Sequence, residues 1–366
     1  MERVAVIGVA QTVFEARKEA ETYADLVYEV ADQALKDAGM DISELGNIVT
    51  ASNDFLDGRT ISSMAVGDAA GAAFGGGLNI STVEGDGAFA AFYGLSRILS
   101  GGYSTTLVTA HSKSSEGNPL LISNACFDPV YERALGLDFI SAAALQARVY
   151  MERRGLSERD LAEVVRLNRA KGVLNPHAQV RREISISEVL ASKPLAPPIR
   201  ELDAGPLSDG AAAVILAGED FARRRCSNPV WIEGVSLCAD ARMTDRQLWE
   251  SAALRKAAQA AYGMAGIANP SDEIDVAEIY AAFSYQEPLW LEELGLGAMD
   301  KSRVNPSGGC LCAHALVSAG LVRVIEAVLQ LRGKAANPAP EPRRALAHAQ
   351  SGICGQSHCV WILGKN

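Results

Sequence analysis

The stretch Asn305-Pro-Ser-Gly-Gly-Cys-Leu-Cys-Ala-His314 decides how the rest of this chain is interpreted, because a glycine pair and a histidine precede an apolar segment. Gly308 and Gly309 would let backbone N–H groups approach a ligand closely and form an oxyanion site, although a simple tight turn needs the same residues. His314 precedes a predicted helix over residues 317–331, where an imidazole could act as acid or base. The stretch is therefore a candidate site at the entrance to a helix.

A related stretch occurs earlier, so the sequence contains an internal repeat. Val83-Glu-Gly-Asp-Gly-Ala-Phe89 follows a predicted strand at residues 80–83 and leads into a predicted helix at 88–100. A short predicted strand at residues 303–304 leads into the Asn305 stretch in the same way. Four further pairs of predicted strands recur in the same order: 4–9 with 231–236, 48–51 with 276–279, 105–110 with 345–349, and 211–217 with 359–363.

Strands that alternate with helices predict an α/β protein, with a mostly parallel sheet covered by helices. Almost continuous apolar strands fit burial on both faces of such a sheet. The repeat suggests three parts: residues 1–111 with 207–228, an inserted segment at 112–206, and residues 229–366. We expect the insertion to contain a helix at 139–154 and a second helix capped by Ser157. An insertion of this length usually builds a site rather than a core.

Composition excludes several classes of protein. With 48% hydrophobic and 21% charged residues, the 366-residue chain is typical of a globular protein. The net charge of −10 argues against nucleic acid or an anionic membrane as the main partner. The chain opens without the pattern of a signal peptide, and no apolar run reaches the length of a membrane span. Seven irregularly spaced cysteines suggest reduced thiols, so we expect a cytoplasmic protein.

Four ordered motifs give the chain a resemblance to a known superfamily: Tyr150-Met-Glu-Arg-Arg-Gly155, Asn175-Pro-His-Ala178, Ser208-Asp-Gly-Ala-Ala-Ala213 and the Asn305 stretch. Together they resemble the thiolase superfamily over essentially the whole chain. This resemblance implies a thiolase fold, five-layered αβαβα, from two duplicated halves with mixed, mostly parallel sheets. It also implies that the insertion forms a loop domain facing CoA.

The chain departs from the thiolase pattern at the residues that carry its chemistry. Gly87 stands where a thiolase has its acylated cysteine, and no cysteine precedes Cys126. Tyr280, in Tyr280-Ala-Ala-Phe283, replaces an asparagine, and Ala315 replaces the proline after the histidine. The nearest resemblance is therefore to sterol-carrier-protein-X-type thiolase-like proteins, which include bacterial aldolases of steroid side-chain CoA esters.

A site without an acylated cysteine favours retro-aldol cleavage of a 3-hydroxyacyl-CoA. This reaction needs a base at the β-hydroxyl group and donors around the thioester oxygen. Tyr280 is the leading candidate base, but a phenol with a usual pKa near 10 needs a cationic or hydrogen-bonding neighbour. Alternatively, Tyr280 is an aromatic residue that packs at the end of a strand. His314 could serve the thioester oxygen or act as base, and the missing side chain at Gly87 could leave room for a bulky acyl group.

The remaining candidates are less strongly supported. The resemblance places His348, Cys354 and His358 on a C-terminal loop that faces the active site. Asp54 and Asp86 are expected to be solvated turn residues. No metal is expected, because Cys310, Cys312 and His314 lie too close in sequence for a structural zinc site.

The resemblance also implies partners. CoA enters as part of an acyl-CoA substrate, and no metal or redox cofactor is implied. We expect a homodimer, together with a small OB-fold and zinc-ribbon partner protein that would give a heterotetramer. Two alternatives stay open: a thiolase or acyltransferase for an unusual β-ketoacyl-CoA with a relocated nucleophile, and a non-catalytic acyl-CoA-binding subunit. The sequence does not identify the acyl group.

Overall fold

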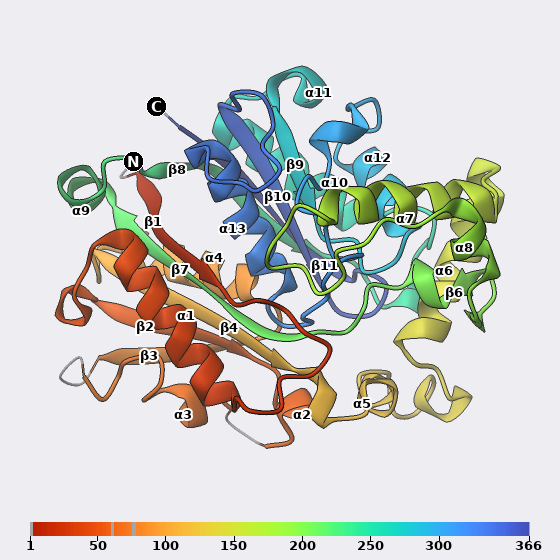
Figure 1. The fold of residues 1–366 in the computed structure, drawn as a ribbon, viewed down its shortest axis with the longest axis horizontal. Coiled ribbons are helices and arrows are strands. Elements are labelled where there is room, and N and C mark those ends of the chain that lie inside the picture. Colours follow the sequence, from red (N-terminus) through yellow and green to blue (C-terminus); the bar gives the residue numbers. More distant parts are fainter. Residues whose placement is uncertain (1–2, 60–61, 75–77, 366) are drawn as a thin grey trace.

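The two halves of the chain join in one large sheet. The computed structural model describes residues 3–59, 62–74 and 78–365. Nine strands follow the order β3-β2-β4-β7-β1-β8-β11-β10-β9 (Figure 1). The strands are β1 (Val4–Gln11), β2 (Asn47–Ser52), β3 (Asn79–Glu84), β4 (Thr105–Lys113), β7 (Asp209–Gly218), β8 (Val230–Ala239), β9 (Val276–Ile279), β10 (Arg344–Ser351) and β11 (Ser357–Gly364). The halves meet where Ala5 pairs with Trp231 and Val6 pairs with Val230.

Most strands within each half run in one direction. In the first half β2 is parallel to β3 and β4, whereas β7 is antiparallel to both β4 and β1. In the second half β9 is parallel to β10, and β11 is antiparallel to both of its neighbours. The predicted mixed, mostly parallel arrangement is therefore confirmed, with β7 and β11 as the reversed strands.

The two halves of the sheet form two layers, and helices form the other three. Helix α1 (Tyr23–Ala38) packs on the outer face of the first half, and α10 (Ala252–Ala265) packs on the outer face of the second. Between them, α4 (Gly87–Leu99) and α13 (Ala319–Arg332) contact one another. Helix α4 packs on strands of the first half, and α13 packs mainly on strands of the second half and also contacts β1 and β7 (Figure 1). Helix α13 is buried on nearly all sides, as expected for a helix in a central layer. The predicted five-layered αβαβα arrangement is confirmed.

One predicted strand is absent. Residues 303–304 form a single bridge, between Val304 and Ala277, and no strand. The Nζ atom of Lys171 donates hydrogen bonds to the carbonyls of Lys301 and Val304, at 2.6 and 2.7 Å. Because that side chain occupies the Val304 carbonyl, the segment does not continue a ladder with β9.

The inserted segment lies on one side of the two halves, seen at the right in Figure 1. Its helices are α5 (Pro119–Ala125), α6 (Phe139–Arg154), α7 (Glu158–Gly172) and α8 (Ile186–Ala191), followed by the two-stranded sheet of β5 (Pro194–Ala196) and β6 (Ile199–Arg200). Helix α6 has its predicted bounds, and Ser157 caps α7 through a capping box. No helix in the described part of the chain has the length and apolar character needed to cross a membrane.

Candidate active site

Tyr280 and His314 are brought together where the halves and the insertion meet. Tyr280 directly follows β9, and His314 lies in the loop before α13. The Oη atom of Tyr280 is 2.9 Å from Nε2 of His314, and the two rings meet edge to face. The backbone N–H of His314 donates to the carbonyl of Pro206 and to Oγ of Ser208. The loop after the insertion therefore fixes the histidine in place.

A cavity of about 210 Å³ opens beside this pair. Its wall combines the pair with residues from the loop before α4, from α5 and α6, and from the β10–β11 hairpin loop. Apolar side chains such as Phe139 and Phe283 predominate, with a few polar groups such as Ser123 and Gln350. A mostly apolar cavity with a few polar groups is the usual form of a small-molecule site.

Burial holds both members of the pair in their neutral forms. It raises the pKa of Tyr280 well above its usual value. Burial, with a smaller contribution from the Arg323 guanidinium, lowers the pKa of His314 to about 4. At neutral pH the phenol O–H can therefore donate to the unprotonated Nε2 atom, and the pair can pass on a proton.

Gly87 is not in the cavity wall, so the expectation that its missing side chain makes room for an acyl group was wrong. A Cβ atom at Gly87 would lie 2.7 Å from Cβ of Ala110 and 2.8 Å from Cβ of Leu321, inside the core. Gly85 lines the cavity instead, and its φ of +122° disfavours any residue with a side chain. Neither glycine position readily accepts a cysteine.

Gly87→Ala is expected to destabilise the protein by about 1–3 kcal/mol, because the added methyl group overpacks a closed space between α4, β4 and α13. Gly263→Ala is the matched control, since it also lies in a helix and its added Cβ atom would meet nothing within 4 Å. The control should be neutral or slightly stabilising. Urea unfolding measures both, and equal stabilities for the two variants would contradict the packing argument.

Gly308 and Gly309 do not face the cavity, so an oxyanion site there is also excluded. The N–H of Gly308 donates to the carbonyl of Asn305, and the N–H of Gly309 donates to Oγ of Ser307. Both glycines have positive φ, and Gly308 packs against Gly172. The alternative interpretation, a tight turn, is the one that the structure supports.

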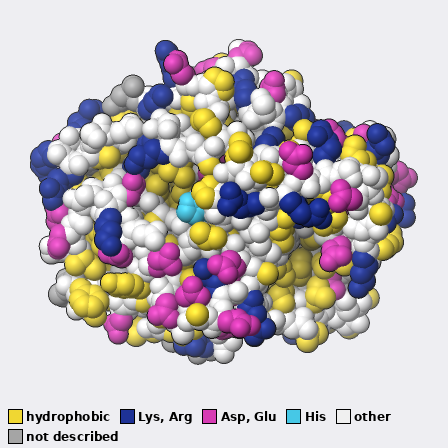
Figure 2. Space-filling view, viewed as in Figure 1, with side chains coloured by type: hydrophobic (Ala, Val, Ile, Leu, Met, Phe, Trp, Pro, Cys, Tyr) yellow, Lys and Arg dark blue, Asp and Glu magenta, His cyan; other side chains and the backbone are white. Residues whose placement is uncertain are grey.

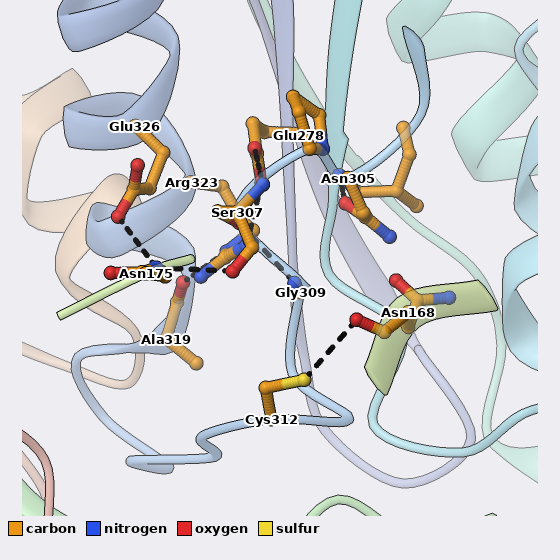
Figure 3. A network of polar contacts seen from close by, with 12 residues as sticks. Asn168, Asn175, Glu278, Asn305, Ser307, Gly309, Cys312, Ala319, Arg323 and Glu326 are labelled. Atoms are coloured by element: carbon orange, nitrogen blue, oxygen red, sulfur yellow. Dashed lines mark hydrogen bonds and ion pairs between the residues drawn. The ribbon is translucent and has the colours of Figure 1, made fainter. Parts of the chain in front are cut away.

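The Asn305 stretch is fixed by a buried network of charges (Figure 3). Glu278, on β9, accepts from Nη1 of Arg323 at 2.6 Å and from Oγ of Ser307 at 2.7 Å. The side chain of Asn305 accepts from the N–H of Ile279 at 2.6 Å. The bonds of Ser307 and Asn305 both tie the stretch to β9. The network therefore sets the position of His314 relative to Tyr280.

His348 and His358 lie within β10 and β11 rather than on a loop, so their predicted placement was wrong. They pair with each other, with Nε2 of His348 3.0 Å from Nδ1 of His358, and pack beside Trp290 behind the cavity. Neither lines the cavity. Burial lowers the pKa of His348 to about 3 and that of His358 well below its usual range.

These buried histidines make the protein sensitive to acid. A histidine whose pKa is lowered by folding stays neutral in the folded state, while the unfolded chain binds a proton below pH 6.5. Each such histidine therefore removes about 2 kcal/mol of stability when the pH falls from 7 to 5. His348→Gln should reduce the measured loss between these pH values by about that amount. Equal losses in the variant and the wild type, measured by urea unfolding, would exclude this cause.

The cysteines differ in their access to the cavity. Cys354 lines it from the hairpin loop, where it has a positive φ, and Cys126 lines it from the end of α5. Burial raises the pKa of Cys354 to about 12 and raises that of Cys126. Cys310 and Cys312 are buried away from the cavity, with pKa values raised to about 12 and about 11. The described residues contain no group of three or more His, Cys, Asp or Glu side chains placed to hold a metal ion.

Sequence reasoning missed a second cavity, of about 400 Å³, in the insertion. Arg169 and Arg182 line it together with apolar residues such as Leu195 and Leu202. Arg169 is 4% exposed, and its Nε and Nη1 atoms meet no acceptor within the described part of the chain. In Figure 2, hydrophobic side chains gather in a hollow on the side of the insertion, near Lys and Arg side chains.

Asp86 was also misjudged, because it is buried in the cavity wall and not solvated. It caps α4, which an aspartate before an apolar helix could have indicated. Asp54 begins the short helix α2 (Asp54–Asp57) and accepts hydrogen bonds from Ser62. Nothing in the local sequence marks Cys126 or Arg169, since their access to cavities depends on how the insertion packs.

The duplicated α/β halves with two helices between them define a thiolase-like protein. The thiolase C-terminal domain-like family matches residues 236–365. The acetyl-CoA acetyltransferase of Methanothermobacter thermautotrophicus is 30% identical over 357 residues, which cover 92% of each chain. This chain belongs to the thiolase family. The sterol carrier protein 2 of Oryctolagus cuniculus is 28% identical, over 94% of this chain and 69% of that protein.

Two solved structures share the fold. The "Ltp2-ChsH2(DUF35) aldolase" superposes with a TM-score of 0.82 at 22% identity, covering 99% of this chain and 98% of that one. Human mitochondrial 3-ketoacyl-CoA thiolase superposes with a TM-score of 0.80 at 16% identity, covering 100% of this chain and 99% of that one. Both similarities establish the fold alone.

Proposed function

We propose that this protein cleaves a 3-hydroxyacyl-CoA by a retro-aldol reaction, giving a ketone or aldehyde and a shorter acyl-CoA. One observation carries the proposal: a neutral Tyr280–His314 pair faces a cavity whose thiols are held protonated. Acyl transfer through cysteine needs a thiolate. A proton-transfer pair without a ready nucleophile suits a reaction that needs no covalent intermediate.

The pair would work as a relay. Tyr280 accepts the proton of the β-hydroxyl group while its own proton passes to Nε2 of His314, 2.9 Å away. The Cα–Cβ bond breaks, a carbonyl group forms at Cβ, and the electron pair moves into the thioester enolate. In this relay the phenol stays neutral throughout, so its raised pKa does not oppose the proton transfer.

The Arg169 cavity is suited to the anionic part of CoA. Two cationic side chains, Arg169 and Arg182, share it, and the buried guanidinium of Arg169 has donors to spare for a phosphate group. Phe139 lines both cavities, so an acyl chain beside Tyr280 could continue toward this site. CoA would thus enter as part of the substrate.

Partner proteins belong to the same proposal. The aldolase that shares this fold carries two names, Ltp2 and ChsH2(DUF35). Here, exposed hydrophobic side chains lie on α5 and just after it, and an OB-fold partner could cover them: Leu121 on the helix, and Val130, Tyr131 and Leu135 beyond it. We propose a homodimer with such a partner, and light scattering of the co-purified complex would test for a heterotetramer.

A second candidate, a thiolase or acyltransferase, is favoured by the name of the archaeal relative and by Cys126 and Cys354 in the cavity wall. The two candidate functions, retro-aldol cleavage and acyl transfer, predict different products. A panel of 3-hydroxyacyl-CoA esters with steroid, aromatic and branched side chains should yield a ketone or aldehyde and a shorter acyl-CoA, detected by mass spectrometry. Cleavage should survive alkylation by iodoacetamide, whereas cleavage that needs free CoA and stops on alkylation would overturn the proposal.

A further inference from the structure

Asp86 lies where the N-termini of the two central helices meet. It is the N-cap of α4, where one carboxylate oxygen accepts from the N–H of Ala88 at 2.7 Å. The other oxygen accepts from the N–H of Gly320, in the first turn of α13, at 2.6 Å. The side chain is only 3% exposed, and it lines the same cavity as Tyr280 and His314.

A cap alone does not explain an aspartate at this position. Ser251 caps α10 with a neutral hydroxyl group and is 1% exposed, so a buried cap needs no charge. The aspartates that cap other elements, Asp41, Asp138 and Asp300, are exposed or half-buried. Burying a carboxyl group costs free energy that a serine would avoid. The carboxyl group of Asp86 is therefore unusual in facing a cavity from a dry site.

The surroundings of this carboxyl group leave its protonated and ionised forms similarly populated at neutral pH. Burial raises the pKa of Asp86 to about 7, while the N–H groups of Ala88 and Gly320, and Arg323, oppose the rise. Arg323, on α13, is the charged group that acts on it, whereas Tyr280, Cys310 and Cys359 are neutral because burial raises their pKa values. Such a group can hold a proton and release it within one catalytic cycle.

We propose that Asp86 is the acid that returns a proton to Cα of the shorter acyl-CoA; this role rests on the retro-aldol reaction proposed above. The enolate electron pair forms a C–H bond with the carboxylic proton, which leaves Asp86 as a carboxylate. The proton that left the β-hydroxyl group rests on His314. One proton from His314 returns through solvent to Asp86, so protons and electrons balance.

The test uses acetyl-CoA in D₂O, because exchange of its α-protons needs the acid–base group at Cα and no β-hydroxyl group. The wild-type protein should exchange them, and Asp86→Asn should exchange about a hundredfold more slowly or worse, the usual size of a lost acid–base group. Ser251→Ala, which also removes a helix cap, should retain exchange and controls for lost stability.

Each outcome separates this role from the proposed reaction. If the wild-type protein cleaves 3-hydroxyacyl-CoA and Asp86→Asn exchanges the α-protons at the wild-type rate, the retro-aldol reaction is supported and the role of Asp86 is refuted. Exchange that depends on Asp86, with no cleavage of any hydroxyacyl ester, supports the acid and overturns the reaction. If Asp86→Asn does not fold, the wild-type pH profile decides: a transition near pH 7 supports the role, and a flat profile, or no exchange, refutes it.

Discussion

Tyr280→Phe is expected to lower kcat for cleavage of 3-hydroxyacyl-CoA by a factor of about 100 to 10,000, with little change in KM. The phenylalanine ring fills nearly the same space but removes the oxygen that lies 2.9 Å from Nε2 of His314. Without it, nothing links the substrate hydroxyl group to the imidazole, and general acid–base catalysis of this size is lost. Steady-state kinetics on the best ester of the panel measures the effect.

Tyr285→Phe is the matched control for this prediction. Tyr285 is also buried and has a raised pKa, but its hydroxyl group donates to Gln146 at 2.8 Å and does not line the cavity. The control should lose a hydrogen bond and keep its kcat. Equal kcat values for Tyr280→Phe and the wild type would refute the proposed relay. A similar loss of kcat in Tyr285→Phe would mean that the effect is structural.

The sequence predicted the architecture well because local signals agreed with it. Apolar strands and helix caps each required only a few neighbouring residues, and the internal repeat showed that the same local pattern occurs in both halves. Gly39, Gly266 and Gly333 end α1, α10 and α13 in the left-handed conformation, which glycine commonly adopts just after a helix. The lost strand at residues 303–304 depended on Lys171, which lies in the insertion and far from it in sequence.

The site was harder to predict, because the direction in which a residue points matters there as much as its position in the sequence. Two motifs with separate local signals marked Tyr280 and His314 as candidates, but the sequence did not predict that the two side chains pair. Which of Gly85 and Gly87 lines the cavity depends instead on which of them packs against Leu321, in the other half of the chain, and that residue is Gly87. His348 already lies in the predicted strand at residues 345–349, which conflicts with its expected place on a loop. His358 entered the core because β11 begins at Ser357, two residues before the predicted strand.

Contacts between distant segments also explain why the loss of Arg323 should cost much stability. Arg323, 3% exposed, donates to Glu278, which is fully buried, and to Oγ of Ser307 at 2.7 Å (Figure 3). Glu326, on the same helix, adds a second buried carboxyl group nearby. Removing the cation leaves carboxyl groups in a dry interior without a counter-ion.

Arg323→Met should therefore lower the free energy of unfolding by about 3–5 kcal/mol, the usual cost of breaking a buried ion pair from one side. The surface pair of Arg223 and Glu219 supplies the control, since Arg223→Met should cost less than about 1 kcal/mol. Adding Glu278→Gln to Arg323→Met should recover part of the loss, because the uncompensated charge is then gone. If urea unfolding gives the two single variants similar stabilities, or the double variant recovers nothing, the network does not carry this energy and the Asn305 stretch is held by packing alone.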